Sequence, residues 1–272
     1  MNTTTANKRA LLKSLHSTGC FVIPNPWDIG SARYLAGLGF KALATTSAGF
    51  AWSIGRPDEA VPVESVLAHL RAMAAAVDLP VSADFENGFA DAPEDVAAHV
   101  ALAVDNGIAG LSIEDTSRQA GARLYDIATA TARVKAARAA IDATGADVVL
   151  TARAEGYLAG RPDLADIIAR LKAFSEAGAD CLFAPGLKSD TDIVAVVQAV
   201  APKPVNVVVS TPEFTVARLA ALGVRRISLG GALARAAWTG FMSMADEIAT
   251  GGTFGSLGGV VASATLNTTF QR

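Results

Sequence analysis

The chain has 272 residues, of which 51% are hydrophobic, and its formal net charge at pH 7 is −3. This length supports one large domain with a substantial core, or two small domains. Acidic and basic residues are mixed along the chain and the apolar runs are short, so we expect no nucleic-acid partner and no membrane partner.

Helical and extended segments alternate along the chain. Thr4–Ser17 is predicted to form a helix before the first strand. In the pattern that follows, an amphipathic helix ends at a glycine, which suits the left-handed position after a helix, and a short apolar strand comes next. The predicted strands are Cys20–Pro24, Ala42–Thr46, Val81–Phe85, Gly110–Glu114, Val148–Ala152, Cys181–Ala184, Val205–Val209 and Arg226–Leu229.

These strands are nearly continuously apolar, as expected for strands that are covered on both faces. Eight strand–helix units in about 250 residues predict an α/β fold, the (β/α)8 TIM barrel, with an extra N-terminal helix. A doubly wound open sheet is the alternative, but that fold normally carries a glycine-rich phosphate loop after its first strand. The segment Pro24–Asp28 takes that place and contains no glycine.

The C-terminal segment falls outside the repeat. We assign residues 1–250 to the barrel and 251–272 to a C-terminal tail of the same domain, which begins with the glycine-rich segment Gly251–Gly259. The sequence leaves two alternatives open for this tail. It is a disordered end, or it is an arm that docks on a neighbouring subunit.

The cysteines and the N-terminus indicate the compartment. Cys20 and Cys181 are far apart in the sequence and outside any Cys-x-x-Cys pair, so we expect reduced thiols. Residues 1–13 are polar and lack the hydrophobic centre of a signal peptide. We therefore expect a cytoplasmic protein.

Carboxylates gather at the ends of neighbouring predicted strands. Asp84 and Glu86 are two residues apart, so on a strand they point to the same side, and Glu114 ends the next strand. Burying carboxylates together is costly unless a cation joins them. An all-oxygen set suits Mg²⁺, or Mn²⁺, better than zinc. The alternative is that these acids cap helices or pair with arginines.

Arg153 is the lone charged residue of an apolar strand ending. A guanidinium can hold a carboxylate or phosphate through two hydrogen bonds, which predicts a substrate contact. The alternative is a structural ion pair with Glu114 or Asp84, and both roles can hold together.

Two other features suit a carboxylate ligand. The turn Ser47-Ala48-Gly49 supplies a hydroxyl and backbone N–H groups, although small residues also make ordinary turns. Asn206 is a lone amide in a buried strand and needs hydrogen-bond partners there. A ligand and a core contact are equal alternatives for Asn206.

The strand ends, taken together, resemble the isocitrate lyase/phosphoenolpyruvate mutase family of (β/α)8 enzymes. The resemblance covers nearly all of residues 20–240. Each matching segment is a weak motif by itself, but their order and their places at strand ends are specific. The segments are Pro24–Asp28, Ser31–Arg33, Thr46–Gly49, Gly55–Asp58, Ala83–Gly88, Ile113–Asp115, Thr151–Arg153, Phe183–Gly186, Pro204–Asn206 and Arg226–Gly231.

The resemblance implies a metal site. Asp84, Glu86 and Glu114 would hold Mg²⁺, partly through water, with Asp58 nearby. The family usually has aspartate at the position of Glu86, and glutamate keeps the charge with one more methylene. The resemblance also implies homo-oligomers, dimers or tetramers, because the family commonly exchanges its last barrel helix between subunits. The apolar residues of Gly230–Ala249 suit such a contact.

The resemblance implies a substrate site as well. The residues that would bind an α-oxocarboxylate are Ser47, the backbone of Ala48 and Gly49, Arg153 and Asn206. Ser47, Asp58 and Arg153 would act in catalysis. Family members stabilise an enolate while a C–C or P–C bond breaks, and the physical basis is the binding of developing negative charge by a metal and by Arg153.

One segment departs from the family. Its lyases carry a Lys-Lys-Cys-Gly-His or Lys-Arg-Cys-Gly-His run after the Ile-Glu-Asp motif, and its mutases keep a Lys and an Asn-Ser there. Thr116–Tyr125 contains no Lys, Cys, His or Asn. Tyr157, Arg118 or Arg123 could supply a proton instead. Decarboxylation of an oxaloacetate-like acid needs only the enolate-stabilising part of the site, because CO₂ leaves without a general base.

Three functions follow. The first is a Mg²⁺-dependent carbon–carbon lyase that acts on a small 2-oxo or 2-hydroxy (di)carboxylic acid through a pyruvate-type enolate. The second is P–C bond chemistry of the phosphoenolpyruvate mutase or phosphonopyruvate hydrolase type. The third, from another class, is a non-catalytic barrel that binds a carboxylate.

Overall fold

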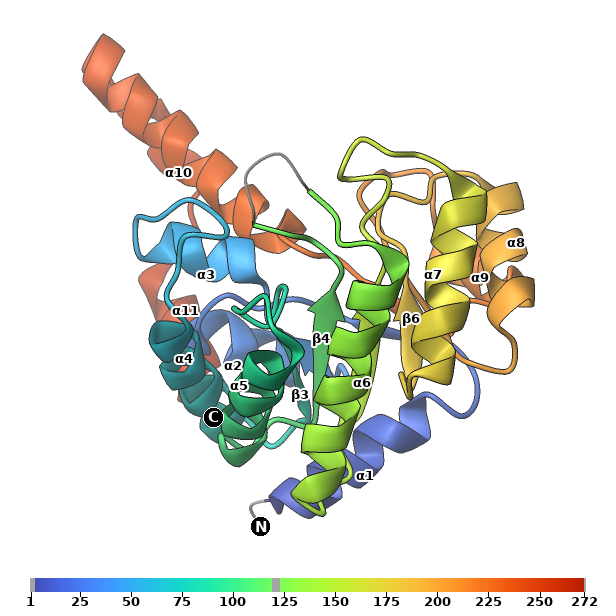
Figure 1. The fold of residues 1–272 in the computed structure, drawn as a ribbon. Helices are drawn as coiled ribbons and strands as arrows, with labels where there is room; N and C mark the ends of the chain where they lie inside the picture. Colours follow the sequence, from blue (N-terminus) through green and yellow to red (C-terminus); the bar gives the residue numbers. More distant parts are fainter. Residues whose placement is uncertain (1–2, 119–122, 272) are drawn as a thin grey trace.

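Eight parallel strands form the centre of the protein, whose computed structural model describes residues 3–118 and 123–271 (Figure 1). The strands are β1 (Phe21–Ile23), β2 (Leu43–Ala44), β3 (Val81–Asp84), β4 (Gly110–Glu114), β5 (Val149–Arg153), β6 (Cys181–Phe183), β7 (Val205–Val208) and β8 (Arg226–Ser228). They pair in the order β1-β8-β7-β6-β5-β4-β3-β2. Between β1 and β2 the N–H of Ala44 donates to the carbonyl of Pro24 at 3.0 Å, so the barrel is nearly closed. The predicted (β/α)8 barrel is confirmed.

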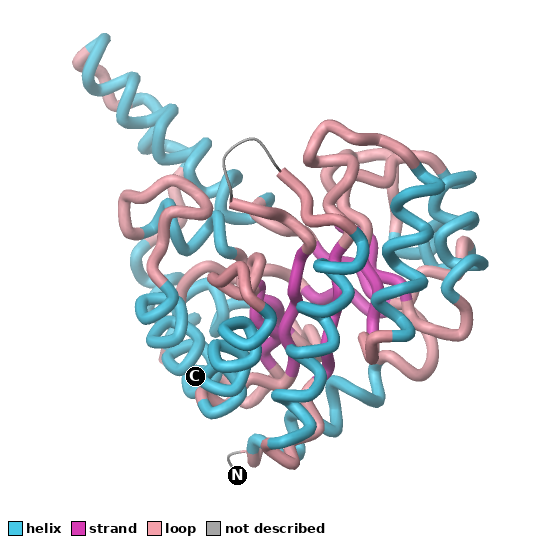
Figure 2. Tube along the Cα trace, in the orientation of Figure 1, coloured by secondary structure: helices cyan, strands magenta, loops and turns pink. Residues whose placement is uncertain are grey.

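Helices surround these strands, as the tube in Figure 2 shows. They are α1 (Thr5–Leu15), α2 (Ile29–Gly37), α3 (Ser47–Ser53), α4 (Val63–Ala76), α5 (Pro93–Asp105), α6 (Ile127–Ala143), α7 (Leu164–Glu176), α8 (Asp190–Val200), α9 (Val216–Ala221), α10 (Ala232–Gly251) and α11 (Ser263–Phe270), with a 3₁₀ turn, η1, at Gly255–Gly259. The predicted extra N-terminal helix is α1. Part of the segment that departs from the family, residues 119–122, lies outside the described residues.

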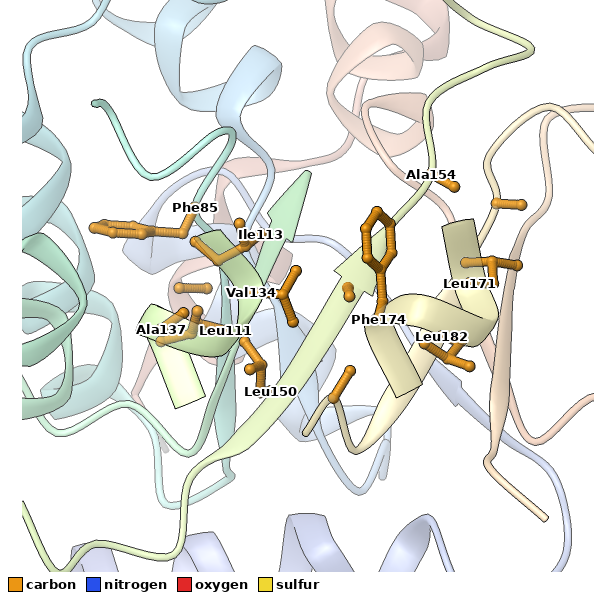
Figure 3. Close-up of a cluster of buried hydrophobic side chains, with 14 of the residues drawn as sticks. Phe85, Leu111, Ile113, Val134, Ala137, Leu150, Ala154, Leu171, Phe174 and Leu182 are labelled. Carbon is orange, nitrogen blue, oxygen red and sulfur yellow. The ribbon is translucent and has the colours of Figure 1, made fainter. Parts of the chain in front are cut away.

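Apolar side chains fill the layer between the strands and the outer helices. Figure 3 shows Val134 of α6 beside Leu111 and Leu150 of the strands, and Phe174 of α7 near Leu182. Each fully buried side chain of this size stabilises the fold by about 1.5–3 kcal/mol. The strands are thus fixed on their outer side, and the polar residues at their carboxyl ends are held on a rigid frame.

Helix α1 covers the N-terminal ends of the strands (Figure 1). Its Leu12 is fully buried and belongs to one apolar cluster with Ile23 and Val149. Nζ of Lys8 donates to the carbonyls of Ala74 at 2.9 Å and Val77 at 2.5 Å, at the end of α4. The barrel is therefore closed at the end opposite the carboxyl ends of its strands.

The C-terminal tail is not a disordered end, because it folds into η1 and α11. Docking of the tail on a neighbouring subunit stays a prediction. Helix α10 extends away from the barrel (Figure 1), and Ala234 is its one residue that is buried. The tail then forms η1 beside α10, and α11 lies against α2 of the same chain. Among the described residues, no helix is both long enough and apolar enough to cross a membrane.

Candidate active site

Three consecutive strands end in charged residues that meet. Asp84, Glu114 and Arg153 are the last residues of β3, β4 and β5, and Glu114 and Arg153 are register partners. Parallel strands bring their carboxyl ends to one face of a barrel, so this grouping follows from the fold. The sequence predicted all three as site residues, and in the structure Arg153 contacts both Asp84 and Glu114.

Arg153 lies at the centre of this group. Its Nη1 is 2.8 Å from Oδ1 of Asp84, and its Nη2 is 3.2 Å from Oε2 of Glu114 and 2.6 Å from Oε1 of Glu155. Burial by itself would lower the pKa of Arg153, but Glu155, Glu114 and Asp84 outweigh it and raise the pKa above its ordinary value. The structural ion pair that was the alternative for Arg153 is therefore present.

Glu155 is a site residue that the sequence interpretation did not select. It is 3% exposed and also accepts a hydrogen bond from Nε of Arg153 at 2.7 Å. Its N–H donates to Oδ1 of Asp115 at 2.8 Å. The signal was its spacing, because a residue two positions after Arg153 can lie on the same side of the chain.

Glu86 follows β3 in a left-handed turn. The φ angles of Glu86 and Phe89 are 47° and 58°, and residues other than glycine adopt this region only when surrounding contacts hold them there. Its carboxylate pairs with Nη2 of Arg118. Burial raises the pKa of Glu86 to about 8, against the effect of Arg118 and with smaller contributions from Asp84 and Glu114.

Carboxyl groups outnumber guanidinium groups around this turn. Burial raises the pKa of Glu114 while Arg153 opposes the rise, and burial together with Asp84 raises the pKa of Asp58. The described residues contain no group of three His, Cys, Asp or Glu side chains already placed to hold a metal. The carboxylates contact guanidinium groups instead of converging on one point.

A divalent cation nevertheless fits this donor set chemically. The side chains are oxygen donors, and burial raises the pKa of Glu86 and of Glu114, so a nearby cation would favour the ionised form of both. Asp84, Glu86 and Glu114 are the residues that would hold it. Their roles as metal ligands stay a prediction.

The turn after β2 faces the same space. The N–H of Ser47 donates to Oδ2 of Asp84 at 3.0 Å, and the N–H of Gly49 donates to Oγ1 of Thr46 at 3.3 Å. A Cβ at Gly49 would lie 2.7 Å from Cγ2 of Thr46 and 2.8 Å from Cβ of Trp27, so close packing requires glycine there. Ser47 and Ala48 line the central cavity, while Gly49 packs beneath them.

Two cavities adjoin at this face. The central one, of about 210 Å³, reaches from Ser47, Asp58 and Arg153 into the barrel as far as Asn206 and Arg226. The second, of about 240 Å³, shares Ser47, Asp58 and Arg153 and is lined by Glu86, Glu114, Glu155, Thr116 and Arg123. Asn206 is fully buried, and its Nδ2 donates to Oγ of Ser228 at 3.0 Å. Of the predicted site residues, Gly49 alone lines neither cavity.

The family follows from comparison with known proteins. The model of the phosphoenolpyruvate phosphomutase family matches residues 12–249. The chain belongs to this family. Its members include lyases and mutases, so the prediction of an enzyme from the isocitrate lyase/phosphoenolpyruvate mutase family is confirmed.

Several family members are similar over most of the chain. A Burkholderia cenocepacia protein provisionally named a lyase/mutase has a structure with a TM-score of 0.95 and 46% identity, covering 98% of each chain. An uncharacterised Mycobacterium tuberculosis protein is 37% identical over 79% of this chain and 80% of its own. Oxaloacetate decarboxylase of Pseudomonas aeruginosa is 31% identical over 82% and 79%. The structure of 2,3-dimethylmalate lyase is similar with a TM-score of 0.85 and 27% identity, covering 99% and 95%.

Proposed function

We propose that this family member is a Mg²⁺-dependent lyase that cleaves or decarboxylates a small 2-oxo or 2-hydroxy acid through a pyruvate-type enolate. The carrying observation is the ring of carboxylates around Arg153, next to a cavity of about 210 Å³. The similarity to oxaloacetate decarboxylase and to 2,3-dimethylmalate lyase supports this choice of substrate class.

Each part of the site would have a separate role in the reaction. Ser47 and the backbone of Ala48 would orient the substrate carboxylate, with Arg153 facing the reacting centre. Arg153 would gain a negative partner in the transition state that the substrate lacks, which is the condition for faster chemistry. A divalent cation held by Asp84, Glu86 and Glu114 would supply further stabilisation of negative charge on the 2-oxo oxygen.

Decarboxylation of an oxaloacetate-type acid is one reaction that this site could catalyse. The C3–C4 bond breaks, CO₂ leaves, and the electron pair of that bond becomes the enolate of pyruvate. A proton then adds to C3 and gives pyruvate. Arg123 and Asp58 line the cavity at this face, and the raised pKa of Asp58 suits a carboxyl group that can donate a proton.

Turnover of a substrate panel tests the proposal. The panel contains oxaloacetate, 2-methylisocitrate, 2,3-dimethylmalate and phosphonopyruvate, each with Mg²⁺ or with a chelator, and oxalate serves as an enolate mimic in calorimetry. We expect Mg²⁺-dependent release of pyruvate or another 2-oxo acid, and inhibition by oxalate. Oxalate binding without any turnover would instead support the non-catalytic carboxylate-binding barrel. No turnover and no oxalate binding would refute both.

P–C bond chemistry is the second candidate, because the matching family model describes a phosphomutase. It predicts that phosphonopyruvate is converted to phosphoenolpyruvate, or hydrolysed to pyruvate and phosphate. Phosphorus NMR separates these products from unreacted substrate. An unchanged spectrum, together with turnover of oxaloacetate, would leave the carbon–carbon lyase.

We also propose a cytoplasmic homo-oligomer. The exposed face of α10 and the tail carries Trp238, Phe241, Met242, Ile248 and Phe254, each at least 38% exposed. An apolar surface of this kind is typical of an interface. Light scattering is expected to give a dimer or tetramer, and Phe241→Asp should dissociate it. The two cysteines are free thiols, which suits a reducing compartment.

A further inference from the structure

The floor of the central cavity contains a buried arginine with uncharged partners. Arg226 begins β8 and is 5% exposed. Its Nε donates to Oδ1 of Asn206 at 2.8 Å and its Nη1 donates to Oγ1 of Thr151 at 3.0 Å. Across residues 3–118 and 123–271, no carboxylate lies within ion-pair distance of it. A buried guanidinium of this kind has lost its hydration and has gained no opposite charge in return.

The barrel leaves space beside this arginine. Ser82, Ser112 and Thr151 each stand two residues before a charged strand end, so they point to the same interior side as Asp84, Glu114 and Arg153. In most barrels of this type bulky branched residues fill the interior positions. Here the residues are small and polar, and the cavity extends down to Arg226.

Several donors at the floor have no acceptor. Of the five N–H groups of a guanidinium, Arg226 directs three toward Asn206, Thr151 and His16, whose Nε2 is 3.4 Å from Nη1. The two N–H groups of Nη2 have no acceptor in the described part of the chain. Asn206 uses one hydrogen of its amide nitrogen on Ser228, and one remains.

His16 adds no charge to the floor. Its Nδ1 is 2.8 Å from the carbonyl of Leu12 and therefore carries the hydrogen, which leaves Nε2 as an acceptor for Arg226. Burial, and then Arg226, lowers the pKa of His16 to about 3. The ring is neutral at physiological pH, so the floor carries the single positive charge of Arg226.

The two arginines of the cavity act on each other. Burial lowers the pKa of Arg226 below its ordinary value, Cys181 opposes this, and Arg153 lowers it further. Arg153 is surrounded by three carboxylates, whereas no carboxylate of the described residues contacts Arg226. A ligand anion in this cavity therefore gains most from the floor.

We propose that Arg226, Asn206 and Ser228 form a carboxylate-binding subsite at the floor of the central cavity. The proposal rests on the proposed function, because the ligand is the acid described above. One carboxylate would lie near Ser47 and the backbone of Ala48, and a second would accept hydrogen bonds from Nη2 of Arg226 and the amide of Asn206. The floor thus selects acids that carry a second carboxylate.

Ligand binding tests the subsite without turnover. Calorimetry in the presence of Mg²⁺ compares malate and succinate, which can reach both ends, with oxalate, which is too short to do so. Arg226→Met is expected to weaken malate binding about 10- to 100-fold, the range of a lost charged hydrogen bond, and to change oxalate binding less than about threefold. Arg9→Met is the control, because Arg9 also donates to uncharged acceptors, the carbonyls of Ile108 and Val104, but lies outside the cavity.

The outcomes separate the two proposals. Equal loss of malate and oxalate affinity in Arg226→Met, or no loss of either, would overturn the subsite. So would a wild-type protein that binds oxalate but neither malate nor succinate. Malate binding that depends on Arg226 without any turnover would keep the subsite and refute the proposed lyase. If Arg226→Met does not fold, Ser228→Ala removes one hydroxyl, and we expect about fivefold weaker malate binding with unchanged oxalate binding.

Discussion

Two arginines, the partly buried Arg153 and the buried Arg226, face one cavity in opposite electrostatic surroundings. Arg153, at the carboxyl ends of the strands, contacts Asp84, Glu114 and Glu155. Arg226, at the floor, contacts an amide, a hydroxyl and a neutral imidazole. An arginine side chain therefore has a different role at each end of the cavity. The upper arginine is one part of a charged cluster suited to chemistry, and the lower one is an unpaired charge suited to recognition.

An arginine in an ion pair and an arginine in a binding site respond differently to substitution of the residues around them. Breaking a buried pair leaves a charge without compensation and costs several kcal/mol, whereas an arginine with neutral partners retains its attraction for an anion. Substitutions at the upper end are therefore expected to change stability and metal binding, whereas substitutions at the floor are expected to change ligand binding.

Substitution of Arg153 should have the largest effect. Arg153→Met leaves Asp84, Glu114 and Glu155 unpaired, and we expect a loss of about 3–5 kcal/mol in the free energy of unfolding without metal. Mg²⁺ should restore part of it, because a cation replaces the lost charge. Thermal and urea denaturation with Mg²⁺ or a chelator measure this. Equal stability losses in both conditions would contradict a metal at this end.

The same variant tests catalysis. Arg153→Met should lower kcat/KM by at least about 10²-fold, the typical result of removing a donor to developing negative charge. Arg153→Lys is the control, since it keeps the charge and loses the paired hydrogen bonds. Activity of the methionine variant within a factor of ten of wild type would remove Arg153 from the mechanism.

Glu86→Gln tests the metal assignment. The substitution keeps the shape of the side chain and removes its charge, so we expect Mg²⁺ to bind at least about tenfold more weakly. Calorimetric titration with Mg²⁺ gives the affinity without any substrate. Glu64→Gln, on the first turn of α4, is the matched surface control. Unchanged Mg²⁺ affinity in Glu86→Gln would place the cation elsewhere.

Glu155 positions Arg153 and is expected to have an intermediate effect. Glu155→Gln weakens two contacts of the guanidinium, at 2.7 and 2.6 Å, while Asp84 and Glu114 still hold it. We expect kcat to fall about 10- to 100-fold, since small displacements of a catalytic group have effects of this size, with little change in Mg²⁺ affinity. A parallel loss of Mg²⁺ affinity would mean that Glu155 belongs to the metal site instead.

The pKa of His16 at the floor predicts that stability depends on pH. His16 titrates near 6.5 when unfolded and near 3 when folded, so between these pH values the unfolded state binds more protons. Stability then falls as the pH falls, by at most about 1.4 kcal/mol per pH unit from this group, and above about pH 6.5 the loss is absent. His16→Gln should show a shallower decline in urea denaturation between pH 7.5 and 5. Identical slopes would contradict the buried neutral ring.

Much of the site was predictable from residue order. Asp84, Glu114 and Arg153 end neighbouring apolar strands, and parallel strands place such ends together. Glu155 could be seen in the sequence near the same strand end, but in many sequences a carboxylate two residues after an arginine makes no contact with it. The tail was not predictable, because whether α11 lies on α2 or on another subunit depends on surfaces that the local sequence does not describe.

Sequence by itself determined the barrel, the family and the charged strand ends, since these depend on periodic patterns and on local order along the chain. Tertiary structure alone decided which charges neutralise one another. Arg226 stands at the beginning of its strand, where a sequence interpretation finds no active site, yet its long side chain reaches Thr151 across the barrel interior. Electrostatic energy depends on the distance between charges and on their burial, and the spacing of residues along the chain determines neither of these.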